Sequence, residues 1–255
     1  MNDADLAAYF QVEPEILRFV PELLQDLDAL GSDPDLVVEW LGEAGVRGPE
    51  RRVLDLGCGK GAVAVAVAEG LGYRVHGVEA FSPFVEAARR RAASHGAGGL
   101  CTFVPGDLRD TVAEGGDFDA VLLVSVGVLG SPEAMVRGCR ACTRPGGLMI
   151  LEEAYLLEPG RLEFSGYGDL VTRAETLRQL TSHGDELVRE RRTTLAEMQA
   201  QNRRFTAWIE GRAAELAVRH PEHAPAFRAY VEKERRECEL LETALECATW
   251  MLRRV

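Results

Sequence analysis

The stretch "RRVLDLGCGKGAVAVAVAEG", residues 51–70, decides how this chain folds. The apolar run at 52–57 has the length of a buried strand, and the run rich in alanine and valine after Gly61 has that of a helix. Gly57 and Gly59 complete a set of three glycines between the two. Glycine allows a sharp turn and lets a ligand approach the backbone, because no Cβ intervenes. The stretch therefore predicts a strand, a ligand-binding turn and a helix with free N-terminal N–H groups.

The alternation of strand and helix continues outward from this stretch. Further strands are expected at 74–79, 101–107, 118–126, 148–153, 185–194 and 247–255. Several of these runs are almost wholly apolar, which is typical of parallel strands buried on both faces. With right-handed crossovers, the pattern predicts an α/β fold, namely a Rossmann-like, seven-stranded, mostly parallel sheet with helices on both faces. Apolar residues at helical spacing add N-terminal helices and a helical cap inserted before the last strand.

Four parts are expected along the chain. Residues 1–48 form an N-terminal helical lid segment, and residues 49–194 form the Rossmann-like cofactor-binding core. Residues 195–246 form the cap insertion, and residues 247–255 return to the core as its last strand. The motif "RHPEHAP", residues 219–225, divides the cap into two helices because proline disrupts a continuous helix.

Composition excludes several classes of partner. The chain has 255 residues, a formal net charge of −12 and a pI of about 5.0, so nucleic acid is not an expected partner. It lacks an apolar stretch of membrane-spanning length and a secretory signal, so we expect no membrane partner and a cytoplasmic location. Cys139 and Cys142 form a lone C-x-x-C without a second pair, so no metal site is expected. The sequence does not indicate the oligomeric state.

Acidic residues at the strand ends indicate the kind of ligand. A phosphate-binding P-loop needs Ser or Thr after Gly-Lys, but Gly61 follows Lys60. A dinucleotide and a nucleoside sulfonium remain as alternatives. Asp55 favours the second, because a carboxylate beside a pyrophosphate is repelled, whereas one beside an ammonium group and a positive sulfur is attracted. Glu79 ends the second strand, where an acid can accept hydrogen bonds from ribose hydroxyls, and Asp107 ends the third.

In order and spacing, five motifs resemble those of class I S-adenosylmethionine-dependent methyltransferases: "VLDLGCGKG", "VEAFSP", "PGDLRD", "FDAVLLVSV" and "RPGGLMILEE". The resemblance covers about residues 50–155 and implies S-adenosyl-L-methionine as cofactor and S-adenosyl-L-homocysteine as product. The cap and the last strand also resemble a bacterial subgroup with helices inserted before that strand.

Each motif implies a role in holding this cofactor. Asp55 and the glycine turn would hold its methionine part, Glu79 its ribose and Asp107 its adenine, with Leu108 or Phe81 on the adenine ring. The residues expected to bind the cofactor are Asp55, Gly57, Cys58, Gly59, Gly61, Glu79, Ala80, Phe81, Asp107, Leu108, Ser125 and Val126.

The end of the fifth strand is where we expect catalysis. Methyl transfer to a hydroxyl or ammonium group invites a general base, and Glu153 is the first candidate, with Glu152 next. Strand alternation predicts that only one of the two faces the cleft. Tyr155 is expected either to orient the substrate or to pack at the edge of the sheet. The sequence lacks an "NPPY"-like element, so a small-molecule acceptor is favoured over a nucleic-acid base.

Three rival functions remain open at this point. An NAD-dependent oxidoreductase would share the turn and Glu79, yet it leaves Asp55 unexplained. A non-catalytic nucleoside-binding module would bind the cofactor without turnover. An RNA or protein methyltransferase would need a basic rim, and "RRR" at 89–91 is more typical of a solvated helix face.

Overall fold

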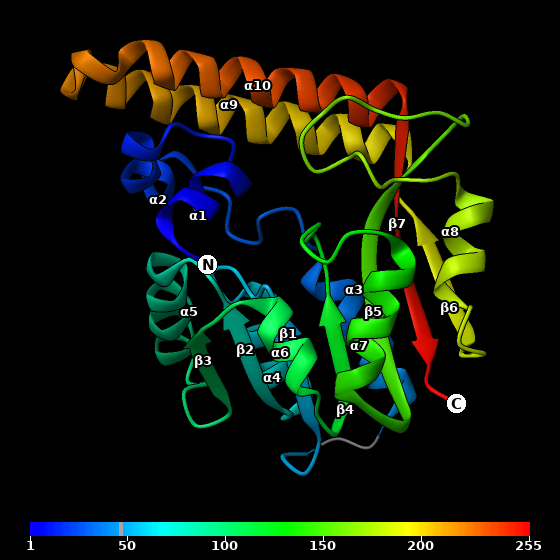
Figure 1. The fold of residues 1–255 in the computed structure, drawn as a ribbon. Helices are drawn as coiled ribbons and strands as arrows, with labels where there is room; N and C mark the ends of the chain where they lie inside the picture. The colour runs from blue at the N-terminus through cyan, green and yellow to red at the C-terminus, as the bar shows by residue number, and fades with distance from the viewer. Residues whose placement is uncertain (46–47) are drawn as a thin grey trace.

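A seven-stranded sheet forms the centre of the molecule. The computed structural model describes residues 1–45 and 48–255. The strand order is β3-β2-β1-β4-β5-β7-β6, with β7 antiparallel to both of its neighbours and the first five strands parallel (Figure 1). The strands are β1 (Arg52–Leu56), β2 (Arg74–Glu79), β3 (Cys101–Pro105), β4 (Phe118–Leu123), β5 (Thr143–Leu156), β6 (Glu186–Arg192) and β7 (Leu245–Arg253). The predicted Rossmann-like, mostly parallel sheet of seven strands is therefore confirmed.

Helices lie on both faces of this sheet. The core helices are α3 (Pro34–Ala44), α4 (Ala62–Leu71), α5 (Ser82–Ser94), α6 (Leu108–Glu114), α7 (Pro132–Cys142) and α8 (Arg173–Leu180). Two apolar clusters, one on each face, join them to the strands; Val53 and Ile150 belong to one cluster, and Leu54 and Met149 to the other. This is the burial on both faces that the apolar strands predict. Cys139 is buried in the second cluster, and its thiol is free.

The N-terminal segment is more broken than its pattern predicts. Before α3, the expected N-terminal helices consist of α1 (Asp3–Tyr9), a 3₁₀ turn η1 (Pro14–Phe19) and α2 (Val20–Leu23). Pro14 and Pro21 each stand in the first turn of a new element, because proline cannot donate to a preceding turn. Residues 46–47, at the end of the expected segment 1–48, lie outside the described residues.

The cap is a long helical pair. Helix α9 (Leu195–Arg219) and helix α10 (Ala224–Thr243) are joined by η2 (Pro221–His223) and lie across the carboxyl edge of the sheet, with α1 and α2 beneath them (Figure 1). One apolar cluster includes Leu23 of α2, Phe84 of α5, Leu216 of α9 and Phe227 of α10. The N-terminal segment therefore packs on the cap as well as on the core. No helix in the described part of the chain is long and apolar enough to span a bilayer.

Strand β5 reaches beyond its parallel neighbour. Its last pair with β4 joins Leu151 to Leu123, whereas its pairing with β7 continues to Leu156. The segment 152–155 therefore has no paired strand on the β4 side, and Leu156 next to it bridges to Thr172. A crevice opens at this point of the sheet edge.

Candidate active site

A cavity of about 800 Å³ lies at the carboxyl edge of the sheet. Strand ends, the N-terminal segment and the cap all contribute to its wall. Of the residues named as site candidates from the sequence, those that line it are Asp55, Gly57, Cys58, Gly59, Glu79, Ala80, Leu108, Ser125, Val126, Glu152 and Glu153. The size suits a nucleoside cofactor together with a second small molecule.

Gly57 and Gly59 of the glycine turn each lie against a different side chain, which leaves no room for a Cβ. Gly57 has φ +73°, and a Cβ there would lie 2.5 Å from Val126. Gly59 has φ +49°, and a Cβ there would lie 2.8 Å from Leu30 of the N-terminal segment. Gly61 serves packing instead, because a Cβ there would meet Ala88 of α5 at 2.9 Å. Gly61 does not line the cavity, and it starts α4 at its N-terminus.

Asp55 is a buried acid with an unsatisfied oxygen. It is 1% exposed, and its Oδ2 has no hydrogen-bond partner among residues 1–45 and 48–255. Burial, together with the negative charge of Glu79, raises its pKa to about 7. A buried carboxylate without a partner is costly, so the site favours a ligand that brings a hydrogen-bond donor or a positive charge.

Glu79 is held by backbone N–H groups. The N–H of Gly59 donates to its Oε2 at 3.0 Å, and the N–H of Phe81 donates to its Oε1 at 2.8 Å. Burial raises its pKa, and these two hydrogen bonds oppose the shift. Ala80 lines the cavity, but the Phe81 ring packs on Phe10 at 5.1 Å between centroids and does not line it.

Asp107 has a different environment from the other two acids. It caps α6, accepting from the backbone N–H of Arg109 at 2.9 Å, and it pairs with the Arg109 guanidinium at 2.6 Å. These hydrogen bonds lower its pKa to about 2. Leu108 lines the cavity beside it, whereas Asp107 does not.

Backbone strain gathers at this cavity. Among the described residues, three that are not glycine have positive φ: Gln11 at 51°, Leu30 at 50° and Ser125 at 58°. All three line the cavity. Conformations of this kind persist where the surrounding structure enforces them, and they gather at ligand sites.

Glu152 and Glu153 both line the cavity, which corrects the expectation that only one of them would. The reason is the missing neighbour on the β4 side, which leaves both faces of β5 open to the crevice at its end. Burial raises the pKa of each carboxyl to about 7. Glu152 accepts a hydrogen bond from Ser125, and Glu153 accepts one from the Ala154 N–H at 2.8 Å.

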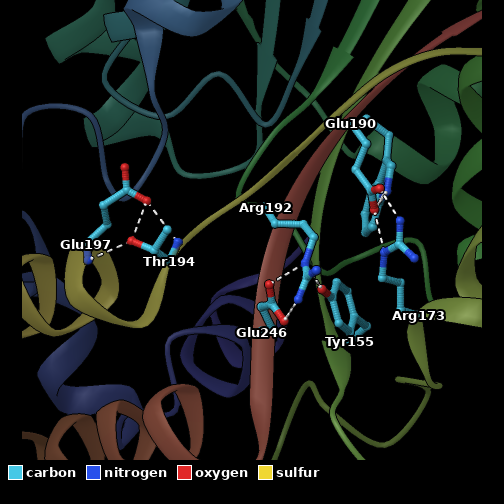
Figure 2. A network of polar contacts seen from close by, with 8 residues as sticks. Tyr155, Arg173, Glu190, Arg192, Thr194, Glu197 and Glu246 are labelled. Carbon is cyan, nitrogen blue, oxygen red and sulfur yellow. Dashed lines mark hydrogen bonds and ion pairs between the residues drawn. The ribbon is translucent and has the colours of Figure 1, made fainter.

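Tyr155 does not line the cavity, so the structure corrects the expectation that it orients a substrate. Its side chain is 2% exposed, and its hydroxyl accepts a hydrogen bond from Arg192 at 3.1 Å (Figure 2). Arg192 is also paired with Glu246 at 2.6 Å. This network joins β5, β6 and β7, so Tyr155 takes the alternative role of packing within the sheet.

The sequence patterns missed several residues that line the cavity. From the N-terminal segment come Tyr9, Gln11 and Leu30, and from α10 come Glu234 and Glu237. The helical periodicity of these segments predicted a cover over the sheet. No local signal marks the individual side chains that enter the cavity.

The cavity fits a cationic nucleoside cofactor on two observations from this chain. Within the described residues Asp55 has an unpartnered oxygen at the strand end, and Gly57 and Gly59, both with positive φ, line the cavity without a Cβ. Glu79 retains carboxylate lone pairs beyond its two backbone hydrogen bonds. A pyrophosphate at the same place would meet two carboxylates.

Comparisons with known proteins agree with this geometry. Residues 53–147 match the family model described as a methyltransferase domain. A methyltransferase from Thiobacillus denitrificans, solved with S-adenosyl-L-homocysteine, has a TM-score of 0.76 and 21% identity, covering 93% of this chain and 98% of its own. One from Geobacter sulfurreducens, solved with the same molecule, has a TM-score of 0.74 and 21% identity over the same shares.

A more distant structure shares the fold over the whole length. The cyclopropane synthase MmaA2 from Mycobacterium tuberculosis has a TM-score of 0.73 and 13% identity, covering 100% of this chain and 99% of its own. The three structural likenesses show the fold, and the match at 53–147 adds the domain type. The chain therefore contains a methyltransferase domain at residues 53–147, and its fold is that of the solved S-adenosylmethionine-dependent methyltransferases.

Proposed function

We propose that the chain transfers a methyl group from S-adenosyl-L-methionine to a small-molecule acceptor inside the cavity. The observation that carries this proposal is the unpartnered carboxylate oxygen of Asp55 beside the glycine turn. The matched domain and the two solved neighbours that hold S-adenosyl-L-homocysteine support the choice of cofactor. The cap over the sheet edge supports a small acceptor.

The residues at the first two strand ends would hold the cofactor. Asp55 would accept hydrogen bonds from the ammonium group of the methionine part, with the backbone at Gly57 and Gly59 close beside it. Glu79 would accept hydrogen bonds from the ribose hydroxyls, and Leu108 would pack on the adenine. Asp107 is engaged by Arg109, so its expected bond to the adenine amino group would require that pair to rearrange.

The bound cofactor supplies an activated methyl group on a positively charged sulfur and leaves as a neutral thioether. The cavity residues position the acceptor behind that methyl group and exclude water, which accounts for much of the acceleration in such displacements. An acceptor with a proton to lose needs a base. Glu153 is our candidate for this role, because one of its oxygens accepts no hydrogen bond from the described part of the chain and burial raises its pKa to about 7.

Calorimetry of the wild-type protein with S-adenosyl-L-homocysteine and with NAD tests the cofactor assignment. We expect a saturable signal with the first ligand and none with the second. The reverse result would favour an oxidoreductase. Release of S-adenosyl-L-homocysteine is then measured with the low-molecular-weight fraction of a cell extract and with its macromolecular fraction, and release with the second alone would contradict a small acceptor.

A further inference from the structure

One end of the cavity, where strand β5 contributes Glu152 and Glu153, has its own set of charges. We call it the acceptor end and define it by Tyr9, Glu152, Glu153, Tyr167 and Glu237, which all line the cavity. The negative charges of Glu153 and Glu237 both raise the pKa values of the two tyrosines, after the larger effect of burial. These side chains from α1, β5, α10 and the loop before α8 are therefore close enough to act on one another.

The cations around this end already have partners. Lys233 is paired with Glu234 at 2.6 Å and lies 3.6 Å from Glu237. Arg191 is paired with Glu197 at 2.9 Å. Arg204, which also lines the cavity, stacks over the Phe205 and Trp208 rings.

Glu152 and Glu153, by contrast, form no ion pair within residues 1–45 and 48–255, although the positive charge of Arg191 acts on Glu152 and lowers its pKa against the larger effect of burial. Glu153 uses one oxygen for the Ala154 N–H, and its other oxygen, beside Gly127, makes no hydrogen bond. Both carboxyls are buried deeply enough to raise their pKa values to about 7. Two adjacent carboxylates in the cavity wall, of which only Glu152 feels the charge of a cation, are costly when both are ionised, and a bound positive charge relieves that cost.

Tyr9 supplies a second and independent observation. Tyr9 is 42% exposed and lines the cavity, and the negative charges of Glu79, Glu153 and Glu237 act on its hydroxyl. Within the described residues its hydroxyl has no hydrogen-bond partner. An aromatic ring that is free on the cavity side attracts a cation by its quadrupole. Lys233 over the Tyr230 ring, at 4.8 Å, is an example of this pairing in the same wall.

We propose that the methyl acceptor is a small amine, which binds as an ammonium ion between Glu152, Glu153 and the ring of Tyr9. This inference rests on the proposed methyl transfer and specifies its substrate class. A neutral hydroxyl would leave Glu153 without a counter-charge and Glu152 with that of Arg191 alone, and an acidic acceptor would add a further negative charge to this end of the cavity.

The amine must lose a proton before it can react. The ammonium passes one proton to the Glu153 carboxylate, which frees the nitrogen lone pair. This lone pair forms the new bond to the methyl carbon, while the carbon–sulfur bond breaks and its electron pair stays on sulfur. The products are an N-methylated ammonium ion, a neutral carboxylic acid and a neutral thioether, so the total charge of +1 is kept, as follows from general acid–base chemistry.

Matched sets of small molecules test the proposal. The protein is saturated with S-adenosyl-L-homocysteine at pH 8 and titrated with benzylamine, benzyl alcohol and benzoate, and with hexylamine, hexanol and hexanoate. We expect each amine to bind at least about tenfold more tightly than its alcohol, since a paired buried charge is worth this much or more. Formation of N-methylated product from S-adenosyl-L-methionine is measured on the same amines.

Variants identify the groups responsible. Glu153→Gln and Glu152→Gln are each expected to reduce amine affinity about tenfold and to leave alcohol binding unchanged, and Tyr9→Leu to reduce amine affinity severalfold. Glu114→Gln, an exposed acid on α6, is the control and should change nothing. Equal binding of amines and alcohols, tighter binding of the carboxylates, or unchanged amine binding in both glutamine variants would overturn the proposal.

The affinity for S-adenosyl-L-homocysteine is measured first in every protein, along with the melting temperature. Failure of the wild type to bind it contradicts the proposed function itself. Normal binding of S-adenosyl-L-homocysteine without a preference for amines contradicts only the inference about the acceptor.

Discussion

Asp55 is the residue of the site whose buried carboxyl most clearly lacks a hydrogen-bond partner within the described residues. Its carboxyl is buried, one oxygen has no partner, and the nearby Glu79 adds a second negative charge. A residue in this state destabilises the free protein when it is ionised, yet it favours a cationic ligand by the same interaction. Removal of the Asp55 charge should therefore raise the free energy of unfolding of the free protein and lower its affinity for a cationic ligand.

Asp55→Asn tests this opposition directly. We expect the variant to bind S-adenosyl-L-homocysteine at least about tenfold more weakly, because a charge-assisted hydrogen bond to the ligand ammonium is lost. At pH 8 its melting temperature without ligand should equal or exceed that of the wild type, because a buried charge is removed. Calorimetry and thermal unfolding measure the two quantities. Asp117→Asn, an exposed change, is the control, and a variant that melts lower but binds normally would contradict the assignment.

The raised pKa of Asp55 also predicts how binding depends on pH. A ligand ammonium prefers the ionised carboxylate, and a group with a pKa of about 7 goes from mostly protonated at pH 6 to mostly ionised at pH 8. The affinity for S-adenosyl-L-homocysteine should therefore rise about tenfold over this interval. Asp55→Asn should show a flatter profile in the same calorimetric series, and an affinity in the wild type that falls with rising pH would refute the prediction.

The same pKa values fix the sign of the stability change. The unfolded acids ionise near pH 4, whereas Asp55, Glu152 and Glu153 in the folded protein stay protonated until about pH 7. Between pH 4 and pH 7 the folded state holds more protons than the unfolded state. These groups therefore contribute fully to the free energy of unfolding below pH 4, and this contribution is lost as the pH rises to 7. Melting temperatures of Glu153→Gln and the wild type, measured without ligand from pH 5 to pH 8, should converge at the low end and diverge at the high end, with the variant more stable. A variant that gains no relative stability as the pH rises would contradict this.

At the scale of elements, local pattern was enough for most of the sheet but not for its irregular parts. The expected strand at 74–79 matches β2, because an apolar run between turn residues is a local signal. Strand β5 begins at Thr143, five residues earlier than expected, because Pro145 and Gly146 indicate a turn whereas the backbone pairs with Phe118 across a register shift. Helix α6, of seven residues, was too short to show a period.

The residues of the site also fall into two groups, those that local sequence patterns predict and those that they do not. Asp55, Glu79 and Glu153 could be identified from the sequence, because each stands at the end of a recognisable strand. Tyr9 and Glu237 could not be identified, because they are brought together across more than two hundred residues by the packing of the N-terminal segment under the cap. Tyr155 was misplaced, because strand alternation cannot tell a cavity wall from a packed network.

The segment from Glu22 to Asp28 joins the cap to the core. On the cap side, Arg219 pairs with Glu22, and Arg212 pairs with Asp26 at 2.7 Å. On the core side, Arg91 of α5 pairs with Asp28 at 2.7 Å. Ion pairs on both sides of this segment therefore connect the cap helix α9 to the core helix α5.

Lys60 is the contact that ties this segment to the glycine turn itself. Its Nζ donates to the carbonyl oxygens of Leu24 at 2.8 Å and Gln25 at 3.3 Å. Lys60→Met keeps the length of the side chain and removes both hydrogen bonds, so the segment should exchange amide hydrogens faster and S-adenosyl-L-homocysteine should dissociate severalfold faster. Hydrogen exchange and stopped-flow measurements test this. Arg90→Met, an exposed change on α5, is the control, and unchanged exchange at residues 22–30 would show that the tether is dispensable.

At the scale of the whole molecule, the cavity wall is built from parts that are distant in the chain. The N-terminal segment, the strand ends of the core and the cap each supply residues to it. A ligand that contacts the strand ends and the N-terminal segment together stabilises only the state in which these parts are assembled. Ligand binding should therefore stabilise the molecule as one unit rather than as separate parts.

Thermal unfolding measures this coupling. At a ligand concentration of about one hundred times Kd, binding adds about 2.7 kcal/mol to the free energy of unfolding, and this raises the melting temperature of a chain of this size by about 5–11 °C. We expect S-adenosyl-L-homocysteine to give such a shift in a single transition for the wild type, a much smaller one for Asp55→Asn at the same concentration, and the full shift for Asp117→Asn. Two transitions, of which the ligand moves only one, would mean that the cap unfolds independently. The cavity would then be closed by a loosely attached cover rather than by the common core of α2, α5, α9 and α10.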